Sequence, residues 1–211
     1  MSSYHRIQTE KWLKTIDVKA DRVLDVGGSQ LPIKGRTKSW DVKEYKILDL
    51  PEPHECKQEP DIITDINDSW IEDSRKEVDE ELKDEGLEIS KYDIIFCIEV
   101  NEYWWNSYQA LKNINYLLKI GGILYITFPF IYMAHKPEGM DFLRYTPAGV
   151  EKLLKETNFE IIEHKFRMAT SGKLVEFYNE EKMRGLSDFN HNIIGSMIKA
   201  KKYYENFTNT G

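Results

Sequence analysis

The sequence places acidic residues at the ends of several short apolar runs that are typical of strands. There are four of these acids: Asp25, Asp49, Asp65 and Glu99. In a parallel sheet the carboxyl ends of the strands form one edge, and ligand crevices open there. Any single acid could simply cap a turn. Because all four recur at the same kind of position, we expect them to surround one binding site.

The residue types around these acids suit a ligand that contains a nucleoside. Asp49 closes the second predicted strand, where a carboxylate can accept hydrogen bonds from both hydroxyls of a ribose. Gly27 and Gly28 follow the first strand, and paired glycines let a ligand approach the main chain closely. Asp65 and Ile66 are expected to hydrogen-bond and flank an adenine ring.

A second group of reactive side chains follows the fifth apolar run. His135 is the first candidate for a general base, because an imidazole with a pKa of about 6.5 exchanges protons near neutral pH. Asp141 is expected to hold this base or an acceptor hydroxyl. Arg144 and Tyr145 are candidates for binding a phosphate, a carboxylate or a sugar ring. Arg144 is equally suited to an ion pair with Asp141 or Glu138 that holds the loop.

Strands alternate with helices along the chain, which predicts an α/β fold with a doubly wound, mostly parallel sheet. The predicted strands cover residues 22–26, 45–48, 62–64, 92–98, 123–128, 160–166 and 195–200. Helices are expected over residues 3–16, 71–91, 108–118 and 172–183, and one more begins at Thr146-Pro147. Gly121 and Gly122 are expected to end the helix before the fifth strand.

We expect one domain over residues 1–211, because no repeat, low-complexity segment or long linker divides the chain. Three parts stand apart from the alternating pattern: an N-terminal capping helix within residues 1–20, an acidic helical insertion over residues 71–91, and an insertion over residues 167–195 before the last strand.

In these features the chain resembles the class I S-adenosylmethionine-dependent methyltransferases, and in particular the methyltransferase type 11 group. The segments that carry the resemblance are VLDVGG, YKILDL, PDIITDIND, YDIIFCIEVNEYWW, LLKIGGILYITFPF and DFLRYTPAGVEKLL. They run from Arg22 to about Phe166 in the family's order. The resemblance implies a seven-stranded Rossmann-like sheet whose last strand is antiparallel, and S-adenosylmethionine as the cofactor.

The resemblance also implies which residues bind the cofactor. Gly27 and Gly28 match residues that approach its methionine part, Asp49 matches the ribose-binding acid, and Asp65 matches an adenine contact. The full implied set is Asp25, Gly27, Gly28, Asp49, Leu50, Asp65, Ile66, Ile98 and Glu99.

Two segments depart from the family pattern. The third glycine of the first turn is absent, and Pro32 and Gly35 argue against an ordinary helix directly after it. A Glu-His pair that usually follows the fourth strand appears here as NEYWW. Its Trp104 and Trp105 are either core anchors or the aromatic wall of an acceptor pocket.

Composition excludes several other kinds of protein. The chain has 29 Lys and Arg against 36 Asp and Glu, a formal net charge of -7, so a nucleic acid is not the expected substrate. Cys56 and Cys97 cannot form a disulfide scaffold, and the five histidines show no close pairing, so no metal site is expected.

The N-terminal residues carry charges throughout, and no apolar run reaches the roughly 18 residues of a membrane span. We therefore expect a soluble, cytoplasmic protein without a membrane partner. The oligomeric state stays open.

These features together predict methyl transfer from S-adenosylmethionine to a small-molecule acceptor, with the hydroxyl of a sugar or a similar metabolite as the expected target. Two alternatives remain. An NAD-dependent oxidoreductase would share the glycine turn and Asp49 but would leave Asp65 and the segment 141–145 without a role. A non-catalytic module that binds the cofactor would use the acidic insertion to contact a partner.

Overall fold

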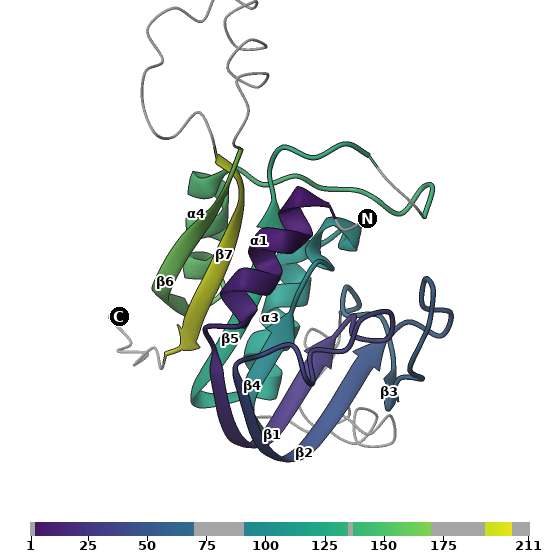
Figure 1. The fold of residues 1–211 in the computed structure, drawn as a ribbon, viewed down its shortest axis with the longest axis vertical. Coiled ribbons are helices and arrows are strands. Elements are labelled where there is room, and N and C mark those ends of the chain that lie inside the picture. The colour runs from purple at the N-terminus through teal and green to yellow at the C-terminus, as the bar shows by residue number, and fades with distance from the viewer. Residues whose placement is uncertain (1–2, 70–90, 135–136, 170–192, 204–211) are drawn as a thin grey trace, which may run out of the picture.

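The computed structural model describes residues 3–69, 91–134, 137–169 and 193–203. They form one seven-stranded sheet in the order β3-β2-β1-β4-β5-β7-β6 (Figure 1). The strands are β1 (Asp17–Val26), β2 (Ser39–Asp49), β3 (Ile62–Ile63), β4 (Tyr92–Cys97), β5 (Leu118–Pro129), β6 (Phe159–Met168) and β7 (Ile193–Lys202). β7 runs antiparallel to both β5 and β6, and the other pairs are parallel. The predicted fold class and the inserted antiparallel last strand are confirmed.

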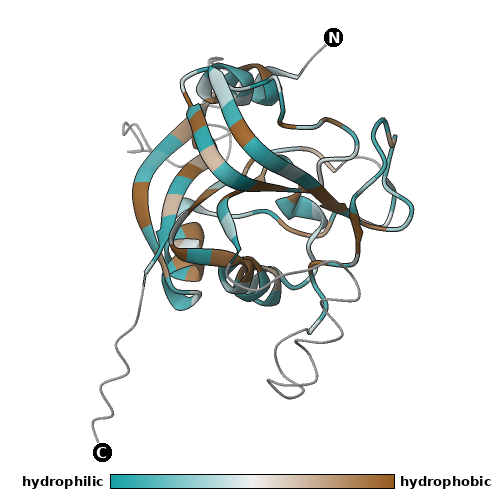
Figure 2. Ribbon diagram, turned by 90° about the horizontal axis from the view of Figure 1, so that it is seen from below, coloured by the Kyte–Doolittle hydropathy of each residue, from teal (hydrophilic) through white to brown (hydrophobic). Residues whose placement is uncertain are grey.

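Helices cover both faces of the sheet. Helix α1 (Tyr4–Leu13) lies on one face, and α3 (Ser107–Leu117) and α4 (Pro147–Glu156) lie on the other (Figures 1 and 2). Two buried clusters fill the interfaces: Trp12 and Leu13 of α1 pack against Phe96, while α3 and α4 bury Leu111 and Leu154 against the opposite face. The sheet is therefore the middle of three layers.

β1 and β2 begin several residues before the predicted strands. In their first halves exposed side chains alternate with buried or partly buried ones, whereas the predicted segments cover only the more buried second halves. The charged residues pair across the two strands: Arg22 Nε lies 2.9 Å from Glu44 Oε2, and Lys43 Nζ lies 2.7 Å from Asp21 Oδ1. Cross-strand pairs of opposite charge thus extend this part of the sheet beyond its apolar core.

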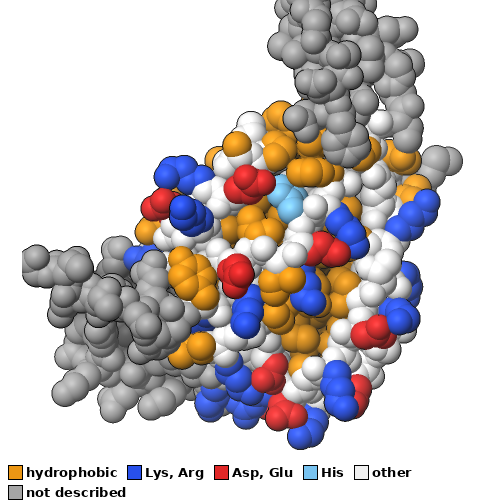
Figure 3. Space-filling view, turned by 90° about the vertical axis from the view of Figure 1, so that its left-hand side faces the viewer, with side chains coloured by type: hydrophobic (Ala, Val, Ile, Leu, Met, Phe, Trp, Pro, Cys, Tyr) orange, Lys and Arg blue, Asp and Glu red, His pale blue; other side chains and the backbone are white. Residues whose placement is uncertain are grey.

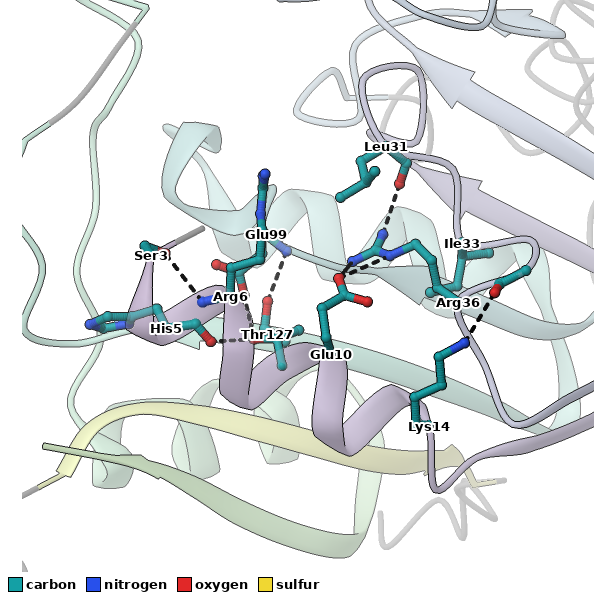
Figure 4. A network of polar contacts seen from close by, with 12 residues as sticks. Ser3, His5, Arg6, Glu10, Lys14, Leu31, Ile33, Arg36, Glu99 and Thr127 are labelled. Atoms are coloured by element: carbon teal, nitrogen blue, oxygen red, sulfur yellow. Dashed lines mark hydrogen bonds and ion pairs between the residues drawn. The ribbon is translucent and has the colours of Figure 1, made fainter. Parts of the chain in front are cut away.

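The connection from β1 to β2 contains no helix, as Pro32 and Gly35 predicted. Its only fully buried hydrophobic side chain is Ile33, which belongs to the same cluster as Trp12 of α1. Arg36 fastens the connection to α1, because its Nη2 lies 2.6 Å from Glu10 Oε1 (Figure 4). The predicted N-terminal helix therefore covers the sheet face that this connection leaves open.

The predicted boundary between α3 and β5 is wrong. α3 ends at Leu117, and β5 begins at Leu118 rather than at residue 123, so the two glycines lie inside the strand instead of ending the helix. Gly121 has a φ of +79°, a conformation that favours glycine, and the pairing with β4 shifts register between Tyr92 and Ile94. The glycines thus accommodate an irregular strand start.

The start of α4 is confirmed as predicted. Thr146 is the N-cap, and its Oγ1 accepts a hydrogen bond from Gly149 N, while Pro147 occupies the first helical position. The helix is short, but the cap fixes where the chain turns after the loop that follows β5.

β6 forms one edge of the sheet and mixes charged with apolar side chains. Figure 3 shows the corresponding side of the molecule, where Lys, Arg, Asp and Glu are interspersed among hydrophobic groups. Lys165 Nζ lies 2.9 Å from Glu163 Oε1 on this strand. Charges on an edge strand oppose pairing with another chain.

Two predicted helices, over residues 71–91 and 172–183, lie almost entirely outside the described residues. β6 extends to Met168 and β7 begins at Ile193, so both strands enter the range expected for the second insertion. Within the described ranges, no helix is long and apolar enough to cross a membrane.

Candidate functional site

A cavity of about 350 Å³ opens at the carboxyl edge of the parallel strands. Its walls come from the ends of β1 and β2, from the turns after β1, β2, β3 and β4, and from the segment 137–142. Six of the nine predicted cofactor residues line it: Gly27, Asp49, Leu50, Asp65, Ile66 and Glu99. Both tryptophans of the NEYWW segment line it as well.

Asp49 is held by the main chain. Its Oδ2 accepts a hydrogen bond from Ser29 N at 3.0 Å, and its Oδ1 accepts one from Leu50 N at 2.9 Å. Each carboxylate oxygen can accept more than one hydrogen bond, so both retain capacity for ligand hydroxyls. The glycine turn and the end of β2 together orient this carboxylate on the cavity wall.

Asp65 lies in a turn that its own side chain stabilises. Its Oδ1 accepts hydrogen bonds from Asn67 N at 2.8 Å and from Asn67 Nδ2 at 2.7 Å. Asn113 of α3 donates through Nδ2 to Ile66 O at 2.8 Å and to the carbonyl of Asp68. Hydrogen bonds from Asn113 therefore connect the turn after β3 to α3.

The other three predicted cofactor residues, Asp25, Gly28 and Ile98, lie behind the cavity wall. Asp25 Oδ2 accepts hydrogen bonds from Ile33 N and from the Tyr45 hydroxyl, both at 2.7 Å. A Cβ at Gly28 would lie 2.5 Å from Asp25 Oδ2, so this glycine lets the buried carboxylate approach the turn. Ile98 packs in the apolar cluster beneath α1. These residues build the site and do not line it.

Burial has an electrostatic consequence at Asp25. The side chain is 3% exposed, and desolvation raises its pKa to about 6 in spite of the two hydrogen bonds that favour the charged form. The Asp25 carboxyl thus holds the turn after β1, but above pH 6 it is charged in a buried position, and this lowers the stability of the folded state.

Glu99 is the first residue after β4 to line the cavity, and it has a positive φ of 56°. Thr127 holds its backbone, because Thr127 Oγ1 accepts a hydrogen bond from Glu99 N at 2.8 Å (Figure 4). Its Oε1 lies 2.6 Å from Arg167 Nη1 and accepts a hydrogen bond from Thr9 Oγ1. Burial opposes its charge, yet the Arg167 cation holds the pKa of Glu99 below its usual value.

Arg167 reaches Glu99 by crossing a neighbouring strand. It lies on β6 opposite Gly195 of β7, and a Cβ at Gly195 would lie 2.6 Å from Arg167 Nε. The guanidinium is fully buried, and within the described part of the chain its Nε and Nη2 have no hydrogen-bond partner. The absence of a side chain at Gly195 therefore makes room for an ion pair between β6 and the segment that follows β4.

The first turn of α1 packs beside this ion pair. Burial and the nearby Arg167 cation lower the pKa of His5 to about 4, so the imidazole is neutral near neutral pH. Its ring contacts the Tyr132 ring edge-on, with centroids 4.6 Å apart. α1 thus touches both the end of the sheet and the loop after β5.

In the loop after β5, Arg144 and Asp141 bind each other. Arg144 Nη1 and Nη2 donate to the two carboxylate oxygens of Asp141, at 2.5 and 2.7 Å. The remaining three N–H groups of Arg144 donate to the backbone carbonyls of Tyr132, Met133 and Leu143. The ion pair that holds the loop, one of the two alternatives for Arg144, is the arrangement observed.

Neither Arg144 nor Tyr145 lines the cavity. Tyr145 is 9% exposed, and its hydroxyl donates to Asn101 O at 2.9 Å and contacts Ser107 Oγ. His135, the predicted general base, lies outside the described residues.

The two tryptophans differ in exposure. Trp104 is 2% exposed and belongs to the core between the sheet and α3, whereas Trp105 is 61% exposed. Trp104 therefore serves as both a core anchor and part of the cavity wall, and Trp105 offers a large apolar surface to solvent.

Several lining residues were not predicted. Glu52, Pro53 and His54 belong to the loop after β2, which folds back because Lys57 N and Gln58 N both donate to Ser29 O. Met140 and Phe142 come from the loop after β5. Only their position after strand ends could have indicated them, since the contacts that fold these loops are long-range.

A scan of the sequence patterns of known protein families finds no match, and no curated protein matches the chain either. Solved structures do match over nearly its whole length. An S-adenosylmethionine dependent methyltransferase from Mesorhizobium loti has a TM-score of 0.58 at 11% identity, covering 94% of this chain and 98% of its own. A SAM dependent methyltransferase from Archaeoglobus fulgidus has a TM-score of 0.56 at 15% identity, covering 94% and 92%.

A third similar structure has a different activity in its name. The [4+2]-cyclase SpnF has a TM-score of 0.55 at 16% identity, covering 94% of this chain and 80% of its own. At such identities the likeness concerns the fold, and one fold can carry more than one chemistry. The strand order, the antiparallel β7 and these matches establish that the chain has the class I fold of S-adenosylmethionine-dependent methyltransferases.

Proposed function

We propose that this protein is an enzyme that transfers a methyl group from S-adenosylmethionine to a small-molecule acceptor. The observation that carries the proposal is the convergence of Gly27, Asp49, Asp65 and Ile66 on one cavity at the carboxyl edge of the sheet. These residues come from three different strand ends, and a set of turn-capping acids would have no reason to share one wall.

The donor and acceptor groups of this wall fit the proposed cofactor. The Asp49 carboxylate keeps hydrogen-bond capacity on both oxygens and suits the two ribose hydroxyls. Asp65 and the apolar Ile66 suit the polar edge and the face of an adenine ring. Gly27 leaves the main chain after β1 open to the methionine part.

When bound, S-adenosylmethionine supplies a methyl group on a sulfonium: the acceptor's lone pair forms the new bond to carbon, sulfur keeps the electron pair of the broken bond, and the acceptor's proton is released. The protein's tasks are then alignment and exclusion of water. The Arg144–Asp141 pair holds the loop after β5 against the cavity, and the Glu99–Arg167 pair fixes the wall after β4.

His135 is the proposed general base, since the oxygens of Asp141 are engaged by Arg144. His135→Ala should leave cofactor affinity unchanged and lower turnover by about 100-fold or more for a hydroxyl acceptor. Steady-state kinetics beside calorimetry of the cofactor separate the two effects. Equal turnover in the variant would remove His135 from the mechanism.

Two other functions compete with this proposal. An NAD-dependent oxidoreductase would use the same turn and the same Asp49, and a non-catalytic module would bind the cofactor without turnover. The similarity to methyltransferase structures favours methyl transfer over an NAD-dependent reaction. A cyclase has the same fold, so the chemistry has to be tested directly.

Calorimetric titration with S-adenosylmethionine, S-adenosylhomocysteine and NAD distinguishes these functions. We expect the first two to bind and NAD not to bind. A methyl-donor turnover assay on a mixture of small metabolites should then consume the cofactor. Binding of NAD alone would refute the proposal, and cofactor binding without turnover on any acceptor would favour the non-catalytic module.

A further inference from the structure

We propose that the acceptor is an uncharged or cationic molecule with a flat apolar body, such as an aromatic ring that bears a hydroxyl or an amine, and that anions and free sugars are excluded. This inference rests on the proposed methyl transfer and concerns the cavity wall as a whole. It follows from the charges of the cavity wall, from the state of the nearby arginines and from a wall of large apolar side chains.

The described lining residues carry negative charge and no Lys or Arg. The carboxylates among them are Asp49, Glu52, Asp65 and Glu99. Even when the Glu99–Arg167 pair is counted as neutral, the wall remains negative. An acceptor with a phosphate or carboxylate would approach like charges, and no Lys or Arg among the described lining residues is there to bind it.

The arginines closest to this wall cannot supply that cation. A guanidinium has five N–H donors, and all five of Arg144 are used by Asp141 and three backbone carbonyls. Arg167 is fully buried beside Glu99 and does not line the cavity. Recruiting Arg144 for an anion would break its ion pair with Asp141, and the fully buried Arg167 is not exposed to the cavity.

The cavity also has an apolar wall, which consists of five residues: Tyr103, Trp104, Trp105, Met140 and Phe142. Two segments far apart in the sequence form it, and backbone hydrogen bonds join them, because Phe142 N and Leu143 N both donate to Glu102 O, at 2.8 and 3.2 Å. The Tyr145 hydroxyl adds a third link through its bond to Asn101 O. The wall is thus built into the fold.

The exposed part of the apolar wall can bind an aromatic ring. Trp105 is 61% exposed and Phe142 is 47% exposed, although large apolar side chains are usually covered. Within this apolar wall the side-chain groups that can form hydrogen bonds are the Tyr103 hydroxyl and the two indole nitrogens. A sugar lying on this wall would therefore find few partners for its hydroxyls, whereas an aromatic ring needs only stacking, and a cation gains from the ring faces.

The test uses the whole protein saturated with S-adenosylhomocysteine and four probes titrated by calorimetry. 4-Methylphenol, tyramine and 4-hydroxyphenylacetate share one hydroxylated ring and differ in charge, and methyl α-glucoside represents a sugar. We expect tyramine and 4-methylphenol to bind at least about tenfold more tightly than 4-hydroxyphenylacetate and the glucoside. Equal or tighter binding of the anion or the sugar, or no binding of 4-methylphenol and tyramine, would overturn the inference.

Two variants locate the binding surface. Trp105→Leu should weaken 4-methylphenol roughly tenfold while the affinity for S-adenosylhomocysteine stays within about twofold. Tyr108→Leu is the matched control, because Tyr108 is an exposed aromatic residue of α3 that does not line the cavity. It should change neither affinity. Parallel losses of both ligands in Trp105→Leu would assign the wall to the cofactor and contradict the inference.

The first titration keeps the two proposals apart. If S-adenosylhomocysteine itself does not bind, the proposed function fails. If it binds and the probes do not follow the expected order, only the acceptor class is wrong.

Discussion

The two halves of the sheet's carboxyl edge use the same residue type in opposite ways. At the ends of β2 and β3, Asp49 and Asp65 accept hydrogen bonds from neutral N–H groups and line the cavity. On the side of β4, β5 and β6, Glu99 forms an ion pair with Arg167, and Asp141 forms one with Arg144. We therefore expect an acid at this edge to be available to a ligand where no arginine reaches it and to stabilise the structure where one does.

The difference follows from what packs over each half. Arg167 is buried beside α1, in a region where an isolated charge would be costly, so Glu99 must compensate it. Asp49 and Asp65 lie in turns whose own backbone satisfies them in part, and their remaining capacity faces the cavity. Substitutions of the paired acids and arginines on the β4 to β6 side should therefore lower the stability of the fold. Substitutions of the acids on the β2 to β3 side should lower the affinity for the cofactor.

Arg167→Met should have the largest effect on stability. Removing the guanidinium leaves the partly buried Glu99 without its cation, and breaking such a pair costs at most about 3–5 kcal/mol. Chemical denaturation measures the loss in the free energy of unfolding. In the double variant Glu99→Gln/Arg167→Met the uncompensated charge is gone, so it should be more stable than Arg167→Met. If the single variant unfolds as the wild type does, the ion pair has no structural role.

Asp25→Asn should reveal the cost of the buried carboxylate through pH. The pKa of Asp25 is raised from 3.8 to about 6, so between these two pH values the folded state binds more protons than the unfolded state. This contribution to stability is fully present below pH 3.8 and is lost as the pH rises through 6. The wild-type advantage over the variant should therefore be about 2 kcal/mol larger at pH 4.5 than at pH 7.5.

Urea denaturation of both proteins at the two pH values measures this difference. His5, whose pKa is lowered, contributes in the opposite direction, but it is present in both proteins and cancels in the comparison. A pH-independent difference would show that Asp25 titrates as an exposed carboxyl does.

Asp141→Ala should have a smaller effect, of about 1–3 kcal/mol on the free energy of unfolding, since Arg144 keeps its three carbonyl partners and is partly exposed. Cofactor affinity should not change. Thermal or chemical denaturation beside calorimetry checks both expectations. A loss of cofactor affinity without a loss of stability would place Asp141 among the binding residues.

The fold, and most of the acids and glycines that line the cavity at the carboxyl edge, could be predicted from the sequence, because both depend on local patterns. Continuous apolar runs mark the strands of a parallel sheet, and the acid that ends each run marks its carboxyl edge. The absence of a helix after β1 was likewise predictable from Pro32 and Gly35.

What could not be predicted depends on contacts between distant residues. Ser29 O folds the loop after β2 over the cavity, Gly195 opens the path from Arg167 to Glu99, and Glu102 O joins the two segments of the apolar wall. No local pattern indicates which acid an arginine will reach. The buried role of Asp25, and the choice of Asp141 rather than Glu138 as the partner of Arg144, thus became apparent only from the three-dimensional arrangement.

The most direct test of the account is the affinity of Asp49→Ala for S-adenosylmethionine, measured by calorimetry beside Asp141→Ala. We expect a loss of about 100-fold in Asp49→Ala, because a carboxylate that accepts two ribose hydroxyls contributes about 2–3 kcal/mol, and no loss in Asp141→Ala. Unchanged affinity in Asp49→Ala, with the fold intact, would contradict the assignment of this edge of the sheet to the cofactor.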